Sequence, residues 1–250
     1  MRIIRFLYKG KSLWGLLESE QVRVLKRGPF DAIDLEESTV SLKEVKLLAP
    51  CVPSKIILAG LNYREHAKEL GMPIPDEPVI FLKPPTSVVG DQDVIVYPRE
   101  TGRLDYEGEL ALVIKKEGKN ISEQQAPGYI LGYTCLNDVT ARDLQKKDGQ
   151  WTRAKGFDTF CPVGPWIETD FNPQDKRITT IVNGAVKQDS RTSDFIFSVH
   201  HLVAFISRVM TLFPGDIIST GTPSGIGPIS AQDEVTVRIE GIGELTNRVA

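Results

Sequence analysis

Long apolar runs and an excess of positive charge are both missing from this sequence. The N-terminal stretch MRIIRFLYKGKSLWG interrupts its apolar residues with Arg or Lys every few positions, so we expect neither a secretory leader nor a membrane span. The formal net charge is −3 and the basic residues are scattered, which removes nucleic acid from the expected partners. We therefore expect a globular protein of the cytoplasm with no membrane partner.

Cysteine and histidine are also scarce, with three residues of each. Cys51, Cys135 and Cys161 lie far apart without CxxC spacing, a pattern that indicates reduced core thiols instead of a disulfide framework or a zinc site. Neither GxxxxGK[ST] nor GxGxxG opens a helix, so phosphate-loop and dinucleotide-binding functions have no support. The glycine-rich STGTPSGIGP predicts only a tight loop that brings backbone N–H groups and Thr222 toward a ligand.

Strand patterns dominate what is present. Residues 1–50 alternate apolar and polar positions and predict a small β module, and Pro50 and Pro53 mark a boundary before a larger domain of residues 51–250. Helical patterns are few, the clearest being NYREHAKEL, VTARDLQKKD and SVHHLVAFISRVM. This distribution predicts a β-rich α+β fold and not an alternating, doubly wound sheet. Strands are expected in KIILAG, DVIVYP, ELALVI, YILGYTCLND, ITTIVNG, DIISTG and EVTVRIEG.

Acidic residues stand at the head of the most apolar of these strands, in LDYEGELALVI. Glu107 and Glu109 share one face of a strand, where two carboxylates repel each other unless a positive group lies between them. Asp138 ends another apolar strand, and three carboxylates would make a site for a hard divalent cation such as Mg²⁺ or Mn²⁺. A polar, solvent-facing strand edge explains the first pair equally well.

A short helix is expected in LNYREHAKELG. Asn62 and Glu65 have the spacing of an N-terminal cap, and Gly71 is a natural helix end. His66 and Glu69 are then three residues apart on one face, where the carboxylate can orient the imidazole as a general base. Surface helices carry such pairs by chance, so the spacing alone leaves a structural role open.

Six segments in succession resemble the signature blocks of the fumarylacetoacetate hydrolase family. They are LNYREHAKE, PVIFLKPPTSVVG, LDYEGELALVI, GYTCLNDVTARDLQ, WTRAKGFDTFCPVGPW and GDIISTGTPSGIGP, and they cover about residues 50–250. The resemblance implies mixed β-sheets rolled into a barrel-like sandwich. It also implies one bound Mg²⁺ or Mn²⁺ per subunit and a homodimer built through the large domain.

The same resemblance assigns roles to individual residues of this chain. It places the metal ligands at Glu107, Glu109 and Asp138, and the catalytic groups at His66, Glu69 and Lys155. Contacts with the carboxylate or other oxygen atoms of the substrate fall on Arg142, Gln145 and Thr222. Arg142 and Lys83 could instead be surface charges or charges next to the metal ligands, and we expect Lys83 to lie outside the site.

The chemistry implied by the resemblance is the cleavage of a carbon–carbon bond in a small 2-oxo or β-diketo acid, such as an acylpyruvate, by hydrolysis. The cation stabilises the enolate that forms, and the His66–Glu69 pair activates water. Decarboxylation, isomerisation and tautomerisation, including reactions of oxaloacetate, use the same groups and remain alternatives, and a non-catalytic binding module is a further one. Met72, Ile74, Tyr97 and Trp151 are candidates for shaping the substrate pocket.

Overall fold

The strand β11 (Gly108–Ile114) is buried along its whole length, inside the largest sheet. Leu110, Leu112 and Ile114 face one hydrophobic core, while Ala111 and Val113 face another, because successive side chains of a strand point to opposite faces. A strand covered on both faces is expected to be continuously apolar, as ELALVI is. The structure is a computed structural model, and it describes residues 1–250.

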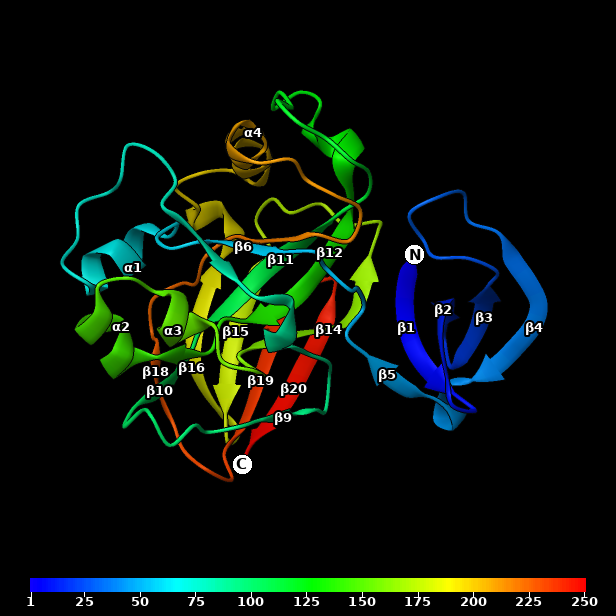
Figure 1. Cartoon of the computed structure of the whole chain (residues 1–250), viewed down its shortest axis with the longest axis horizontal. Coiled ribbons are helices and arrows are strands. Elements are labelled where there is room, and N and C mark those ends of the chain that lie inside the picture. The colour runs from blue at the N-terminus through cyan, green and yellow to red at the C-terminus, as the bar shows by residue number, and fades with distance from the viewer.

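The largest sheet has twelve strands, ten of which form one hydrogen-bonded path (Figure 1). In order along that path they are β4 (Leu35–Ser41), β3 (Gln21–Leu25), β2 (Lys11–Glu18), β1 (Arg2–Tyr8), β14 (Cys161–Glu168), β12 (Ile130–Asn137), β11, β17 (Ile217–Ser219), β6 (Ile56–Ala59) and β7 (Ile80–Lys83). Two short strands pair beside the path, β5 (Lys46–Leu48) with β1 and β8 (Val88–Val89) with β14.

A second sheet covers one face of β11 and β12. Its five strands run in the order β16 (Ala185–Arg191), β15 (Arg177–Val182), β19 (Glu234–Ile239), β20 (Gly243–Val249) and β9 (Val94–Ile95). Ile178, Val237 and Leu245 of this sheet pack against Leu110 and Leu112 in the main core, so the two sheets form a sandwich. A small third sheet joins β13 (Thr140–Ala141), β10 (Leu104–Tyr106) and β18 (Gly227–Ile229).

Four helices complete the fold: α1 (Arg64–Glu69), α2 (Arg142–Asp148), α3 (Thr152–Lys155) and α4 (Val199–Val209). The side chain of Ser198 caps α4 by accepting a hydrogen bond from the backbone N–H of His201, and the buried face of α4 packs on the main core. The short helices α1, α2 and α3 lie together at the opposite side from the N-terminal strands in Figure 1. No helix combines the length and the apolar character that a membrane span requires.

The N-terminal strands β1 to β4 form a lobe of their own in Figure 1. Ile4, Phe6, Val22 and Val24 belong to a small separate core there. Strand β1 also pairs with β14, however, so the lobe extends the large sheet of the rest of the chain. The division into residues 1–50 and 51–250 stays a prediction.

The predicted β-rich α+β fold is confirmed. Each of the three predicted helical segments contains a helix, and all three cysteines are buried and free, as expected. The strand expected in DVIVYP is reduced to the two residues of β9. Several strands of the large domain were not among those expected: the longer strands β7, β14, β16 and β20, and the short strands β8, β10, β13 and β18.

Candidate functional site

Three buried carboxylates meet where β11 begins and β12 ends. One oxygen atom from each of Glu107, Glu109 and Asp138 lies within 4.8 Å of the others. The antiparallel register brings them together, because the backbone N–H of Asp138 donates to the carbonyl of Glu107 at 2.8 Å. The exposed fractions are 6% for Glu107 and 1% for each of the other two, so the alternative of a solvent-facing strand edge is wrong.

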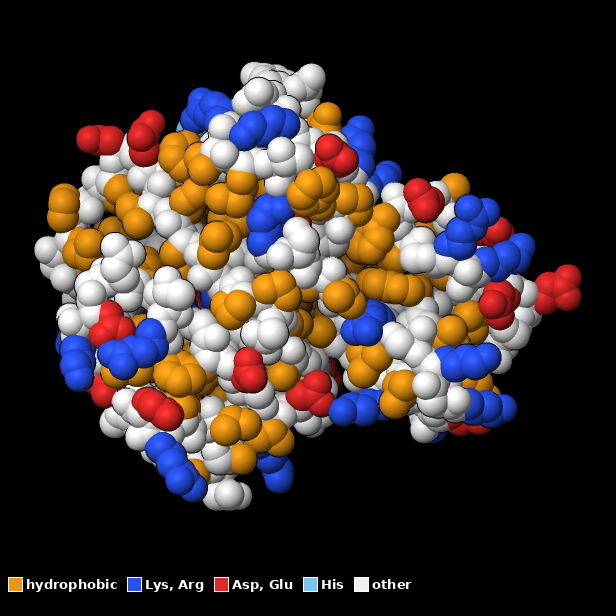
Figure 2. Space-filling view, in the orientation of Figure 1, with side chains coloured by type: hydrophobic (Ala, Val, Ile, Leu, Met, Phe, Trp, Pro, Cys, Tyr) orange, Lys and Arg blue, Asp and Glu red, His pale blue; other side chains and the backbone are white.

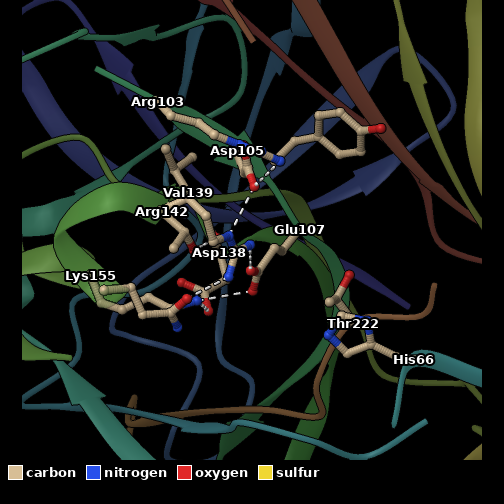
Figure 3. A network of polar contacts seen from close by, with 12 residues as sticks. His66, Arg103, Asp105, Glu107, Asp138, Val139, Arg142, Lys155 and Thr222 are labelled. Atoms are coloured by element: carbon tan, nitrogen blue, oxygen red, sulfur yellow. Dashed lines mark hydrogen bonds and ion pairs between the residues drawn. The ribbon is translucent and has the colours of Figure 1, made fainter. Parts of the chain in front are cut away.

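Cationic side chains neutralise part of this cluster (Figure 3). The Lys155 ammonium contacts Glu107 at 2.9 Å and also Asp138, and Arg142 forms an ion pair with Glu107. Burial by itself would raise the pKa of Glu107, but the charges of Lys155 and Arg142 outweigh it and hold that pKa well below its usual range. Glu107 is therefore ionised throughout the physiological range of pH.

Lys83 pairs with the same cluster but does not line the site cavity, so its placement outside the site stays a prediction. Its ammonium is fully buried and pairs with Asp138, and it also donates to the carbonyl of Val139 at 2.9 Å. A lysine at the end of β7 could not be assigned from the sequence, since only the tertiary fold brings residue 83 beside residue 138. Asp138 thus has two cations, Lys83 and Lys155, as partners.

Glu109 differs from its neighbours because no cationic side chain contacts it. Its carboxylate accepts hydrogen bonds from the Ser219 hydroxyl and from the Gly221 backbone N–H, the latter at 3.0 Å. Burial and then the negative charge of Asp138 raise the pKa of Glu109 well above its ordinary value. A bound cation would offset both effects by favouring the charged form of Glu109. Three carboxylates are ligands of the kind that a hard divalent ion prefers, so these residues fit a metal ion.

Asp105 anchors Arg142 beside the cluster and was missed by the sequence analysis. Its carboxylate is fully buried and accepts from Nε of Arg142 at 2.8 Å and from Nε of Arg103 at 2.8 Å. Arg142 also donates to the side-chain oxygen of Gln145 at 2.6 Å. The Asp105 contact therefore fixes one edge of the Arg142 guanidinium and directs the other edge to Glu107 and Gln145 (Figure 3).

His66 and Glu69 pair on α1 as expected, with 2.8 Å between Nδ1 of His66 and Oε2 of Glu69. The other oxygen of Glu69 accepts from the backbone N–H of Gly225 at 3.0 Å, which ties the pair to the glycine-rich loop. The predicted cap is wrong, because α1 starts after Tyr63 without a side-chain cap. The Asn62 side chain instead bonds the backbone of Phe197 and Thr220 and joins three distant segments.

One cavity of about 480 Å³ collects most of these groups. Of the nine predicted site residues only Glu69 is not on its wall, and the eight that line it are His66, Glu107, Glu109, Asp138, Arg142, Gln145, Lys155 and Thr222. Met72 and Trp151 also line the cavity, whereas Ile74 and Tyr97 do not. The site thus joins an acidic cluster, several cations and an imidazole in one cavity.

Two family models match this chain in succession. The model described as "Fumarylacetoacetate (FAA) hydrolase C-terminal" matches residues 55–250, and the one described as "Rv2993c-like, N-terminal" matches residues 1–50. Together they account for nearly the entire sequence.

Solved structures and named relatives agree with that match. The structure of 5-carboxymethyl-2-hydroxymuconate delta-isomerase from Mycobacterium smegmatis is 44% identical, with a TM-score of 0.95 over 100% of this chain and 99% of that one. The structure of 2-hydroxyhepta-2,4-diene-1,7-dioate isomerase from Mycobacterium marinum is 47% identical, with a TM-score of 0.94 over 100% and 98%. Oxaloacetate tautomerase YisK of Bacillus subtilis is 45% identical over 84% of this chain and 74% of its own. The chain belongs to the fumarylacetoacetate hydrolase family.

Proposed function

We propose that this protein interconverts tautomers or isomers of a small 2-oxo acid, with oxaloacetate as the first candidate substrate. The observation that carries the proposal is the cavity in which three buried carboxylates, a buried imidazole and several cations meet. The similarity to an oxaloacetate tautomerase and to two dioate isomerases supports this reaction class over the hydrolysis that the sequence favoured.

The cofactor that we propose is one Mg²⁺ or Mn²⁺ per chain, held by Glu107, Glu109 and Asp138. When bound, such a cation supplies Lewis-acid stabilisation of negative charge on a substrate oxygen. Lys155 and Arg142 contact the carboxylates of Glu107 and Asp138 in the structure, and they can turn to the carboxylate of a substrate in the same cavity.

His66 is the group that we assign to proton transfer. Its Nδ1 is taken by Glu69, so Nε2 is left to exchange a proton with the substrate. In a tautomerisation the imidazole takes a proton from the enol oxygen or from C3 and returns one to the other position, so no atom is gained or lost. Glu69 stabilises the charged imidazolium between the two steps, and the Gly225 N–H holds Glu69 in place.

Carbon–carbon hydrolysis is the second candidate, and the His66–Glu69 pair is the observation that favours it. The same imidazole can remove a proton from a water molecule that attacks the distal carbonyl of an acylpyruvate, while Lys155 stabilises the oxyanion. Decarboxylation uses the same cavity without needing water, so the acidic cluster alone does not separate the three reactions.

A substrate comparison separates them. Purified protein is incubated with oxaloacetate or with an acylpyruvate, each with Mg²⁺, Mn²⁺ or EDTA, and the products are identified. We expect metal-dependent enol–keto interconversion of oxaloacetate that is faster than the reaction without protein. It should be lost in His66→Ala and retained in the control His200→Ala, which changes a half-buried histidine of α4. Formation of pyruvate and a carboxylic acid from the acylpyruvate, with oxaloacetate unaffected, would establish hydrolysis instead, and CO₂ release would establish decarboxylation.

We also propose a homodimer, formed through the open edge of β7. This strand ends the sheet path, so the backbone groups on its outer side have no partner strand. Val79 and Leu82 are about half exposed at this edge, beside a groove of about 910 Å³. Figure 2 shows hydrophobic side chains on the same face of the molecule as α4. A second copy can add its own β7 across a two-fold axis. Leu82→Arg should convert the dimer to a monomer in light scattering, and Leu7→Arg on the N-terminal lobe is the control.

The three buried, free cysteines support a location in the reducing cytoplasm.

A further inference from the structure

Gln188 connects the edge of the second sheet to the site. It is the one fully buried residue of β16, with 1% exposure. Its Oε1 accepts from the backbone N–H of Gly108 at 2.9 Å, at the point between Glu107 and Glu109. Its Nε2 donates to the Thr222 hydroxyl at 2.8 Å and to the carbonyl of Pro223 at 2.8 Å. A residue without any role in the sequence analysis therefore contacts both the acidic strand and the glycine-rich loop.

These contacts determine the orientation of the Gln188 side-chain amide, that is, the positions of its oxygen atom and its NH₂ group. A backbone N–H can only donate, so the atom facing Gly108 must be the amide oxygen, and the NH₂ group must face Thr222 and Pro223. The Thr222 oxygen consequently accepts one hydrogen bond from Gln188. Its own hydrogen is directed to the carbonyl of Gly108 at 2.9 Å.

The Gly108 carbonyl depends on that hydrogen. The Glu107 carbonyl points toward β12, because it accepts from the backbone N–H of Asp138. Successive carbonyls of a strand point in opposite directions, so the Gly108 carbonyl faces away from β12. Strand β17 ends at Ser219, before it could supply a partner, and the Thr222 hydroxyl takes its place. Turning the hydroxyl hydrogen toward the cavity would leave a buried carbonyl unpaired, which disfavours that arrangement by roughly 5- to 150-fold.

The hydroxyl of Thr222 is thus left with one free lone pair and no hydrogen to offer. Thr222 lines the cavity together with His66, and Figure 3 draws both on the side of the carboxylates away from Lys155. Keto and carboxylate oxygens carry no hydrogen, so they cannot bond to an acceptor of this kind. Of the contacts expected for Thr222, with a carboxylate or with another substrate oxygen, this geometry favours an oxygen that carries a hydrogen.

We propose that Gln188 is a positioning residue that makes Thr222 a hydrogen-bond acceptor, so that this wall of the cavity binds an O–H group. The identity of this group rests on the proposed function: it is either the enol hydroxyl of the 2-oxo acid or a water molecule that His66 activates. The shared chemistry is a hydrogen donated to Thr222 Oγ1, which orients the donor oxygen beside the imidazole.

The test uses Thr222→Val, which keeps the shape and removes the hydroxyl, and Thr222→Ser, which restores the hydroxyl. The first readout is the Kd of oxalate for Mg²⁺-loaded protein by calorimetry, because oxalate has only acceptor oxygens at neutral pH, and the KM for oxaloacetate is measured beside it. We expect both constants to change less than about twofold in Thr222→Val, with kcat reduced about tenfold and recovered in Thr222→Ser. A fivefold weaker oxalate affinity or a fivefold higher KM in Thr222→Val, reversed in Thr222→Ser, would overturn the proposal, since Thr222 would then be a donor.

The two sources of the O–H group are separated by which reaction loses rate. A kcat loss in enol–keto interconversion of oxaloacetate assigns the substrate enol, and a loss confined to acylpyruvate hydrolysis assigns water. Unchanged kcat in both reactions would refute the contact. If wild-type protein showed neither oxaloacetate interconversion nor acylpyruvate hydrolysis, the proposed function would be refuted. Oxalate binding would still report on Thr222 in that case.

Gln188→Glu checks the amide orientation without any substrate. It replaces the NH₂ group by an oxygen facing the Pro223 carbonyl, so we expect the midpoint of thermal unfolding to fall by about 5 °C. The control Gln124→Glu changes an exposed glutamine and should leave the midpoint unchanged. An unchanged midpoint in Gln188→Glu would mean that the amide does not donate to this loop, which would overturn the assignment of Thr222.

Discussion

Gly108 separates the two glutamates of the acidic cluster, and replacing it by alanine tests how tightly that strand is packed. A Cβ at this position would lie 2.1 Å from the Thr180 hydroxyl oxygen and 3.3 Å from Oε1 of Gln188. The backbone of Gly108 does not have a positive φ, so alanine itself is not strained there. The predicted cost comes mainly from the overlap with Thr180, and we expect Gly108→Ala to lower the free energy of unfolding by about 3 kcal/mol.

Thr180 supplies the matched rescue. Its hydroxyl is buried and has no hydrogen-bond partner, so Thr180→Ala removes the overlapping atom and costs about 1 kcal/mol or less. The double variant Gly108→Ala/Thr180→Ala should then be more stable than Gly108→Ala, with a coupling free energy of about 2 kcal/mol in urea unfolding. Strictly additive effects in the double-mutant cycle would refute this account of the packing between β11 and β15.

Three further outcomes test other parts of the structure. Glu109→Ala should weaken metal binding and lower activity together, because it removes one of the three carboxylate ligands; unchanged metal content by mass spectrometry would contradict the assignment. Lys83→Met should lower the unfolding free energy by about 3 kcal/mol, since it leaves buried Asp138 short of a partner, whereas Lys43→Met at an exposed ion pair should change it by less than about 1 kcal/mol; equal effects would oppose this interpretation. Burial raises the pKa of Tyr133 to about 12, compared with about 10 in the unfolded chain. The free energy of unfolding should therefore decline by about 3 kcal/mol between pH 10 and 12, and Tyr133→Phe should reduce that decline. Identical pH profiles for the two proteins would show that Tyr133 is not its source.

The acidic cluster was the part of the site most accessible from sequence. Glu107 and Glu109 are one residue apart at the head of an apolar strand, and period-two geometry places them on one side. Asp138 ends the next long strand, so an antiparallel pairing of the two strands is enough to bring all three together. The pair His66 and Glu69 is likewise local, because a single helical turn determines it.

The contacts that the sequence analysis missed depend on the tertiary fold. Lys83 reaches Asp138 across 55 positions, and Gln188 reaches Gly108 across 80. Strand β16 has a mostly exposed pattern, in which one glutamine carries no signal of burial. Asn62 has the local features of a helix cap, yet hydrogen bonds to distant backbone groups determine its role. Local periodicity cannot specify such partners.

The central claim is that a divalent cation held by Glu107, Glu109 and Asp138 makes this cavity catalytic. The most direct test is a Mn²⁺ titration of metal-free protein, in which bound Mn²⁺ is followed by electron paramagnetic resonance and the enol–keto interconversion of oxaloacetate is measured in the same samples. We predict that the rate rises in proportion to occupancy, saturates at one Mn²⁺ per chain, and is absent in Asp138→Asn. Full activity in EDTA, or Mn²⁺ binding unaffected by Asp138→Asn, would contradict the account.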